Sequence, residues 1–218
     1  MKMKTYDYIL FDLDGTLTDP ANGLISGFEY AFKKLSVDYG ERDSLRRFIG
    51  PPLFEEWQRV FGFTPEESAG AIAKFREYYD VYGWWDNRPY DGIHKMLEAL
   101  VARGKRLAVA TSKPEDTAKR VLNLFGLTEY FDFIGGALRS TERDKKSDVI
   151  NYVLDALGSP RRESCVLVGD RRFDADGAAI CGIDSIGVLW GHGSSEELTS
   201  SGFASIVSSP DELLDVLK

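Results

Sequence analysis

Residues Phe11-Asp12-Leu13-Asp14-Gly15-Thr16 directly follow the apolar run Tyr8-Ile9-Leu10 near the N-terminus. A short, continuous apolar run of this kind is typical of a strand that is buried on both faces. Two carboxylates and a glycine therefore come where the strand ends, and the carboxyl ends of strands are where open α/β sheets bind ligands. Two acids one residue apart repel each other, so they need a cation, a shared proton or a chemical role. Taken alone, the stretch could also be a polar turn that closes a strand.

The composition is ordinary for a soluble globular protein: of 218 residues, 43% are hydrophobic and 28% are charged. The net charge of −8 argues against a nucleic-acid-binding surface, which is usually basic. No run approaches the roughly 18 apolar residues of a membrane span, and the basic start, residues 1–5, leads into too few apolar residues for a signal peptide. Cys165 and Cys181 fall in an expected strand and an expected helix, so we expect two buried free thiols and a cytoplasmic protein.

The pattern of apolar residues divides the chain into two regions. From about residue 20 to residue 85 the apolar residues follow the helical period, and from residue 87 onward short apolar runs alternate with amphipathic helices. The strands expected after the first are 107–110, 131–134, 165–168 and 184–188. This alternation predicts an α/β fold, a Rossmann-like parallel sheet with helices on both faces. We expect a discontinuous catalytic core, residues 1–15 and 87–218, with an inserted all-α cap domain, residues 16–86.

Polar side chains gather at the ends of these strands and should share one edge of the sheet. They are Asp12 and Asp14 after the first strand, Thr111-Ser112-Lys113 after the second, Asp170 and Asp174 after the fourth, and Lys145 and Lys146 before the helix that follows the third. Four clustered carboxylates without a nearby His or Cys predict a hard cation bound through oxygen, with Mg²⁺ first. Hydroxyls, a lysine and a helix N-terminus form an anion site beside it. The combination indicates phosphoryl transfer, which proceeds through an aspartyl-phosphate if a carboxylate is the nucleophile.

These segments resemble the four motifs of the haloacid dehalogenase-like (HAD) hydrolase superfamily, and the resemblance spans nearly the whole chain. The matching segments are 12–16, 111–112, Lys146 and 169–174. The first motif, with its second aspartate Asp14, resembles the form that this motif takes in the phosphatase members of the superfamily. Residues 48–53, 110–114 and 187–193 look most like the phosphoglycolate-phosphatase-like branch, which has a helical cap.

The resemblance implies a role for each matching residue. Asp12 is the expected nucleophile and a metal ligand. Asp14 is the expected general acid and base, and its main-chain carbonyl is expected to bind the metal. Thr111 and the Ser112 amide should hold the phosphoryl oxygens, and Lys146 should neutralise them and shield Asp12.

The remaining assignments follow in the same way. Asp170 should bind Mg²⁺ directly, with Asp174 beside it through water or hydrogen bonds. Thr16 is expected to steady Asp14 and, with Lys113, to complete the phosphate-binding and substrate-binding set, although Lys113 could instead solvate a helix start. Lys145 is the alternative to Lys146.

We therefore expect a cytoplasmic, Mg²⁺-dependent phosphatase whose partner is a small phosphorylated metabolite rather than nucleic acid or a membrane. Phosphoglycolate, a sugar phosphate, a nucleotide and pyrophosphate all fit, and the sequence does not indicate the oligomeric state. The alternatives are a sugar-phosphate mutase or other phosphotransferase on the same core, and a non-enzymatic phosphoryl-accepting module. A dehalogenase would keep an equivalent of Asp12 but would need neither Asp14 nor Mg²⁺.

Overall fold

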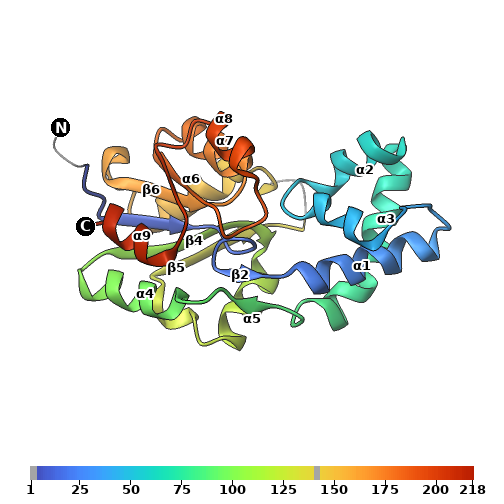
Figure 1. Cartoon of the computed structure of the whole chain (residues 1–218), viewed down its shortest axis with the longest axis horizontal. Coiled ribbons are helices and arrows are strands. Elements are labelled where there is room, and N and C mark those ends of the chain that lie inside the picture. Colours follow the sequence, from blue (N-terminus) through green and yellow to red (C-terminus); the bar gives the residue numbers. More distant parts are fainter. Residues whose placement is uncertain (1–3, 140–142) are drawn as a thin grey trace. The chain divides into compact units, whose positions relative to one another are not determined.

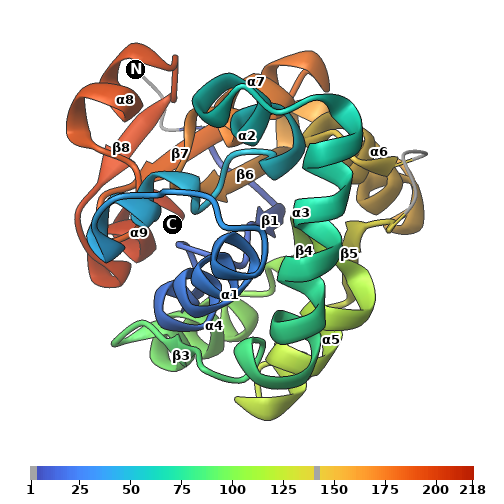
Figure 2. The same ribbon diagram turned by 90° about the vertical axis from the view of Figure 1, so that its right-hand side faces the viewer.

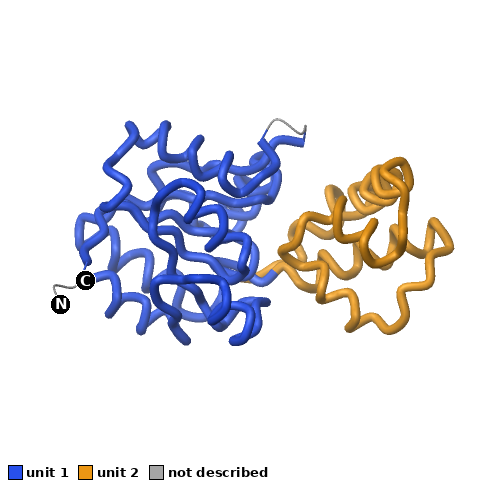
Figure 3. The backbone as a smooth tube through the Cα atoms, turned by 90° about the horizontal axis from the view of Figure 1, so that it is seen from above, with its two compact units in different colours: residues 1–19, 89–218 blue, residues 20–88 orange. Residues whose placement is uncertain are grey.

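The computed structural model describes residues 4–139 and 143–218, and the chain forms two compact units. Unit 1 consists of Met1–Asp19 and Pro89–Lys218, and unit 2 of Pro20–Arg88 (Figure 3). The connecting segments β2 (Thr18–Asp19) and β3 (Arg88–Pro89) pair as a two-stranded sheet. The boundaries lie a few residues later than 15/16 and 86/87 because Leu17 is fully buried and its carbonyl accepts a hydrogen bond from the Tyr90 amide.

Unit 1 is built on a parallel sheet, which confirms the predicted fold class. Its six strands, among the described residues, follow the order β5-β4-β1-β6-β7-β8 (Figure 2). They are β1 (Tyr8–Phe11), β4 (Arg106–Pro114), β5 (Phe133–Ala137), β6 (Cys165–Gly169), β7 (Asp184–Val188) and β8 (Ser205–Val207). The first strand lies inside the sheet, with Phe11 opposite Val109 on one side and Val168 on the other. Residues 9–11 are fully buried, as expected for a strand covered on both faces.

Helices cover both faces of this sheet. The helices of unit 1 are α4 (Ile93–Ala102), α5 (Glu115–Leu124), α6 (Lys146–Ala156), α7 (Arg172–Ile180), α8 (Ser195–Ser200) and α9 (Pro210–Val216), with short 3₁₀ turns at Thr128–Tyr130 and Arg162–Ser164. Helices α4 and α5 lie on one face, and α6 and α7 on the other (Figure 1). This division follows from right-handed crossovers, because the chain first moves from β1 to β4 and β5 and then returns across the sheet to β6 and β7. The carboxyl ends of all these strands therefore lie at one edge.

Unit 2 packs its helices around aromatic side chains. The helices are α1 (Ala21–Lys34), the 3₁₀ helix η1 (Arg42–Phe48), α2 (Leu53–Phe61), α3 (Pro65–Tyr78) and the π-helix η2 (Tyr79–Gly83). Trp57 is fully buried, and its ring centroid lies 5.0 Å from that of Phe32 and 5.9 Å from that of Phe28. These aromatic side chains therefore form much of the core of unit 2. Among the described residues, no helix combines the length and the apolar character that crossing a bilayer requires.

Candidate active site

The loop after β1 brings its two aspartates to the edge of the sheet. The Asp12 amide donates to the Val168 carbonyl of β6 at 2.9 Å, which extends the pairing of β1 one residue beyond the strand. Gly15 then turns the chain with φ +85°, a conformation that L side chains rarely adopt. A Cβ at Gly15 would also collide with the carboxylate of Asp170. The glycine therefore allows the first loop and Asp170 to meet.

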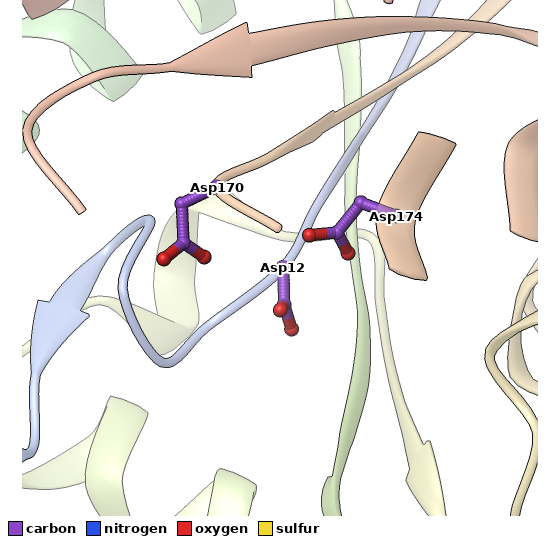
Figure 4. A group of neighbouring side chains, drawn as sticks. All are labelled: Asp12, Asp170 and Asp174. Carbon is purple, nitrogen blue, oxygen red and sulfur yellow. The ribbon is translucent and has the colours of Figure 1, made fainter. Parts of the chain in front are cut away.

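Three carboxylates converge at this edge. Asp12 follows β1, Asp170 follows β6, and Asp174 lies in the first turn of α7 (Figure 4). One oxygen from each lies within 4.8 Å of the others. Asp170 and Asp174 are each only 1% exposed, so two of the three acids are removed from water.

Burial and mutual repulsion raise the pKa values of the two buried acids. Burial, followed by repulsion from Asp174 and Asp12, raises the pKa of Asp170 well above its ordinary value. Burial also raises the pKa of Asp174, to about 6, although the Lys146 charge opposes the shift. Ionised carboxylates of this kind are stabilised by a hard divalent cation bound through oxygen. The acidic triad therefore fits a metal such as Mg²⁺, and the Asp14 side chain is not one of its three members.

Lys146 supplies a cation to the same cluster. Its ammonium lies 3.0 Å from Asp12 Oδ1 and 2.6 Å from Asp174 Oδ1. Burial alone would lower the pKa of Lys146, but the charges of Asp12 and Asp174 outweigh burial and raise it, so the side chain stays protonated. Its neighbour Lys145 is exposed and occupies the N-cap position of α6. Of the two candidate lysines, the structure therefore brings Lys146 to the acids.

The other expected residues lie around this cluster. Thr111 is buried, and its hydroxyl accepts from the Lys113 amide at 3.2 Å, while Ser112 is exposed. The Thr16 hydroxyl lies 3.4 Å from Asp170 Oδ1, so this contact steadies Asp170 rather than Asp14. The Lys113 ammonium lies 2.7 Å from Asp14 Oδ2. Direct contacts of these side chains with a phosphoryl group remain predictions.

The loop after β7 contributes contacts that the sequence did not reveal. The Trp190 indole N–H donates to the Thr16 carbonyl at 3.0 Å, and the His192 amide donates to Asp170 Oδ2 at 2.8 Å. Between them, a Cβ at Gly191 would collide with the Gly15 carbonyl. The glycine-rich stretch 187–193 therefore has a packing function, because it fixes both the first loop and Asp170. The sequence signalled this stretch through its three glycines, at 187, 191 and 193, and through its likeness to the phosphoglycolate-phosphatase-like branch, but not through its contacts.

The pKa of Asp174 gives a testable dependence on pH. Because its native value of about 6 exceeds the ordinary 3.8, its contribution to stability is present at low pH and is lost as the pH rises through about 6. Mg²⁺ binds ionised carboxylates, so protons compete with it. We expect added Mg²⁺ to raise the Tm more at about pH 7.5 than at about pH 5, measured by scanning fluorimetry at matched ionic strength. An equal rise at both pH values, or no rise, would contradict the metal site.

The comparisons with known proteins agree with this geometry. The profile of the haloacid dehalogenase-like hydrolases matches residues 9–188. The crystal structure of a predicted phosphatase from Clostridium acetobutylicum superposes with a TM-score of 0.93, with 39% identity and coverage of 97% of each chain. A 5'-nucleotidase of Pseudomonas aeruginosa is 40% identical over 193 residues, which cover 88% of this chain and 87% of that protein. The tyrosine-protein kinase PtkA of Mycobacterium tuberculosis is 41% identical over 212 residues, which cover 96% of this chain and 72% of PtkA.

These matches confirm the resemblance that the motifs indicated. The profile spans all the matching motifs, from the strand before Asp12 to the strand after Asp174. The predicted enzyme class, a hydrolase of phosphoric monoesters, agrees with the names of the phosphatases among the relatives. The chain belongs to the haloacid dehalogenase-like hydrolases.

Proposed function

We propose that this protein is a Mg²⁺-dependent phosphatase that hydrolyses a small phosphomonoester through an aspartyl-phosphate on Asp12. One observation carries the proposal: Asp12 lies in one cluster with a buried lysine and two buried acids, with Lys146 Nζ 3.0 Å from its Oδ1. A carboxylate in this position can attack phosphorus while neighbouring charges neutralise the phosphoryl oxygens. In phosphoryl transfer the protein contributes mainly positioning and charge neutralisation.

The proposed reaction has two steps. First, a carboxylate oxygen of Asp12 forms a bond to phosphorus, the bond from phosphorus to the ester oxygen breaks, and Asp14 gives its proton to the leaving alcohol. Second, a water oxygen attacks the same phosphorus while Asp14 takes back a proton, and the bond to Asp12 breaks to release phosphate. Thr111, the Ser112 amide and Lys146 would hold the phosphoryl oxygens through both steps.

Asp12, Asp170 and the main-chain carbonyl of Asp14 would bind the metal, with Asp174 beside them. When bound, Mg²⁺ supplies positive charge that screens the acids from the incoming phosphate. Asp170 is prepared for this role by the protein, because the His192 amide and the Thr16 hydroxyl both contact its carboxylate.

The substrate class is proposed from the relatives and from the inserted cap. The relatives include a 5'-nucleotidase, a pyrophosphatase and a phosphoglycolate phosphatase, whose substrates are small phosphate compounds. The chain inserts a helical unit, residues 20–88, between β1 and β4, and inserted caps that exclude bulk water during transfer favour a small substrate over a phosphoprotein.

The test is phosphate release from p-nitrophenyl phosphate and from a panel of phosphoglycolate, sugar phosphates, nucleoside monophosphates and pyrophosphate, with Mg²⁺ or with EDTA. We expect Mg²⁺-dependent release, and at least one panel member with a kcat/KM of about 10⁴ M⁻¹s⁻¹ or more. Failure to release phosphate from every compound would contradict the proposal.

A phosphotransferase is the second candidate, favoured by the similarity to PtkA. The two functions share the phosphorylated aspartate and differ in the acceptor. For a phosphatase, phosphate released should equal ester consumed even when sugars or tyrosine peptides are added. A deficit of phosphate matched by a phosphorylated acceptor would favour the transferase.

A further inference from the structure

Lys113 is a buried lysine whose partner is the proposed general acid and base. Its side chain is 3% exposed and its ammonium lies 2.7 Å from Asp14 Oδ2, while the Asp14 side chain is 18% exposed. Lysines are rarely buried to this extent unless they are paired. This cation is distinct from Lys146, which pairs with Asp12 and Asp174.

The backbone of β4 is built to present Lys113 in this way. The pairing of β4 with β5 is regular up to Thr111, and its register shifts between Thr111 and Pro114. Such irregularities change the direction in which a side chain points, and they are common next to active sites. The Thr111 hydroxyl accepts the Lys113 amide at 3.2 Å and so fixes the irregular segment.

The two carboxylate oxygens of Asp14 have different surroundings. Oδ2 accepts from Lys113, whereas Oδ1 is buried and receives no hydrogen bond from any of the residues described in the structure. Buried polar atoms are nearly always hydrogen-bonded, and an unsatisfied one is expected at a catalytic position, where water or substrate supplies the partner. In the proposed reaction that partner is the oxygen of the leaving alcohol, and afterwards the oxygen of the attacking water.

We propose that Lys113 is a positioning residue that holds Asp14 by Oδ2, so that Oδ1 is the atom that exchanges the proton. The inference rests on the proposed phosphatase function. In the first step, Oδ1 gives its proton to the ester oxygen as the bond from that oxygen to phosphorus breaks. In the second step, Oδ1 takes a proton from the water as its oxygen bonds to phosphorus. Lys113 keeps its own protons throughout.

The test compares Lys113→Met with Lys113→Arg, each made in the wild type and in Asp14→Asn. Phosphorylation of the enzyme is followed in single turnovers with a series of aryl phosphates whose leaving groups range from good to poor. Because general acid catalysis contributes about 10²–10⁴-fold, we expect Lys113→Met to slow the poorest leaving group by about 10–100-fold and p-nitrophenyl phosphate far less. In the Asp14→Asn background, Lys113→Met should cause no further loss of rate. In the otherwise wild-type enzyme, Lys113→Arg should be faster than Lys113→Met, because arginine keeps the positive charge.

Other outcomes separate the two proposals. If Lys113 bound the phosphoryl group instead, Lys113→Met would lower the rate equally for all leaving groups, and its effect would multiply with that of Asp14→Asn. Either result would overturn the positioning role but leave the proposed phosphatase function intact. A wild type that releases no phosphate would remove the proposed function itself. If Lys113→Met does not fold, as judged by circular dichroism, Lys113→Gln takes its place in the same cycle.

Discussion

Replacing Asp12 by asparagine is expected to lower kcat for phosphate release by at least about 10³-fold, because removing a covalent nucleophile removes the reaction path itself. Asparagine keeps the size of the side chain but replaces the attacking oxyanion with a neutral amide. The change also removes one member of the acidic triad and one partner of Lys146. The measurement is steady-state phosphate release with the best substrate of the panel at saturating Mg²⁺.

Asp7→Asn provides a matched control for this variant. Asp7 is exposed and precedes β1, so the same chemical change is made at the opposite end of the strand. We expect its kcat to stay within about twofold of the wild type, as for most surface substitutions. Turnover by Asp12→Asn at the rate of this control would exclude Asp12 as the nucleophile.

Replacing Lys146 by methionine should have the second largest effect. The variant keeps an unbranched side chain, one atom shorter, but leaves Asp12 and Asp174 without the cation that lies 3.0 Å and 2.6 Å from them. Removing one partner of a buried ion pair costs about 3–5 kcal/mol, and removing one group that stabilises transition-state charge costs about 10²–10³-fold in kcat. We expect both losses, measured by urea unfolding and by phosphate release.

Lys145→Met is the matched control, because it shows whether the effect comes from losing a lysine charge or from losing it at the position of Lys146. Lys145 is the preceding residue and is exposed, so this substitution removes the same charge from the surface. Its stability should stay within about 0.5 kcal/mol of the wild type. Equal effects of the two substitutions would contradict the assignment of Lys146 to the cluster.

Much of the site could be predicted from the sequence because parallel strands place their carboxyl ends at one edge. An apolar run followed by acids predicted both the loop after β1 and the strand at 165–168 with the acids that follow it. In the structure this strand, β6, extends one residue further, to Gly169. The expected free thiols are confirmed, since Cys165 and Cys181 are both buried and unbridged. The parallel order of the strands follows from the alternation of strands and helices.

Other features depend on contacts that no local pattern encodes. The second expected strand, 107–110, continues to Pro114 because the end of β4 pairs with β5 across a register shift. That shift determines where Lys113 lies, so its ion pair with Asp14 could not be predicted from the spacing of the two residues in the sequence. The third expected strand, 131–134, is displaced to Phe133–Ala137, and β8 was not expected because three residues are too few to show a period.

Chemical trapping of the phosphorylated enzyme tests the central claim most directly. The protein is mixed with its best substrate, quenched during the first turnover and reduced with borohydride, which converts an acyl phosphate to an alcohol. We predict that mass spectrometry finds the reduced side chain at residue 12 in the wild type and not in Asp12→Asn. A substrate that is turned over with no modification at Asp12, or with modification at a different acid, would contradict the aspartyl-phosphate mechanism.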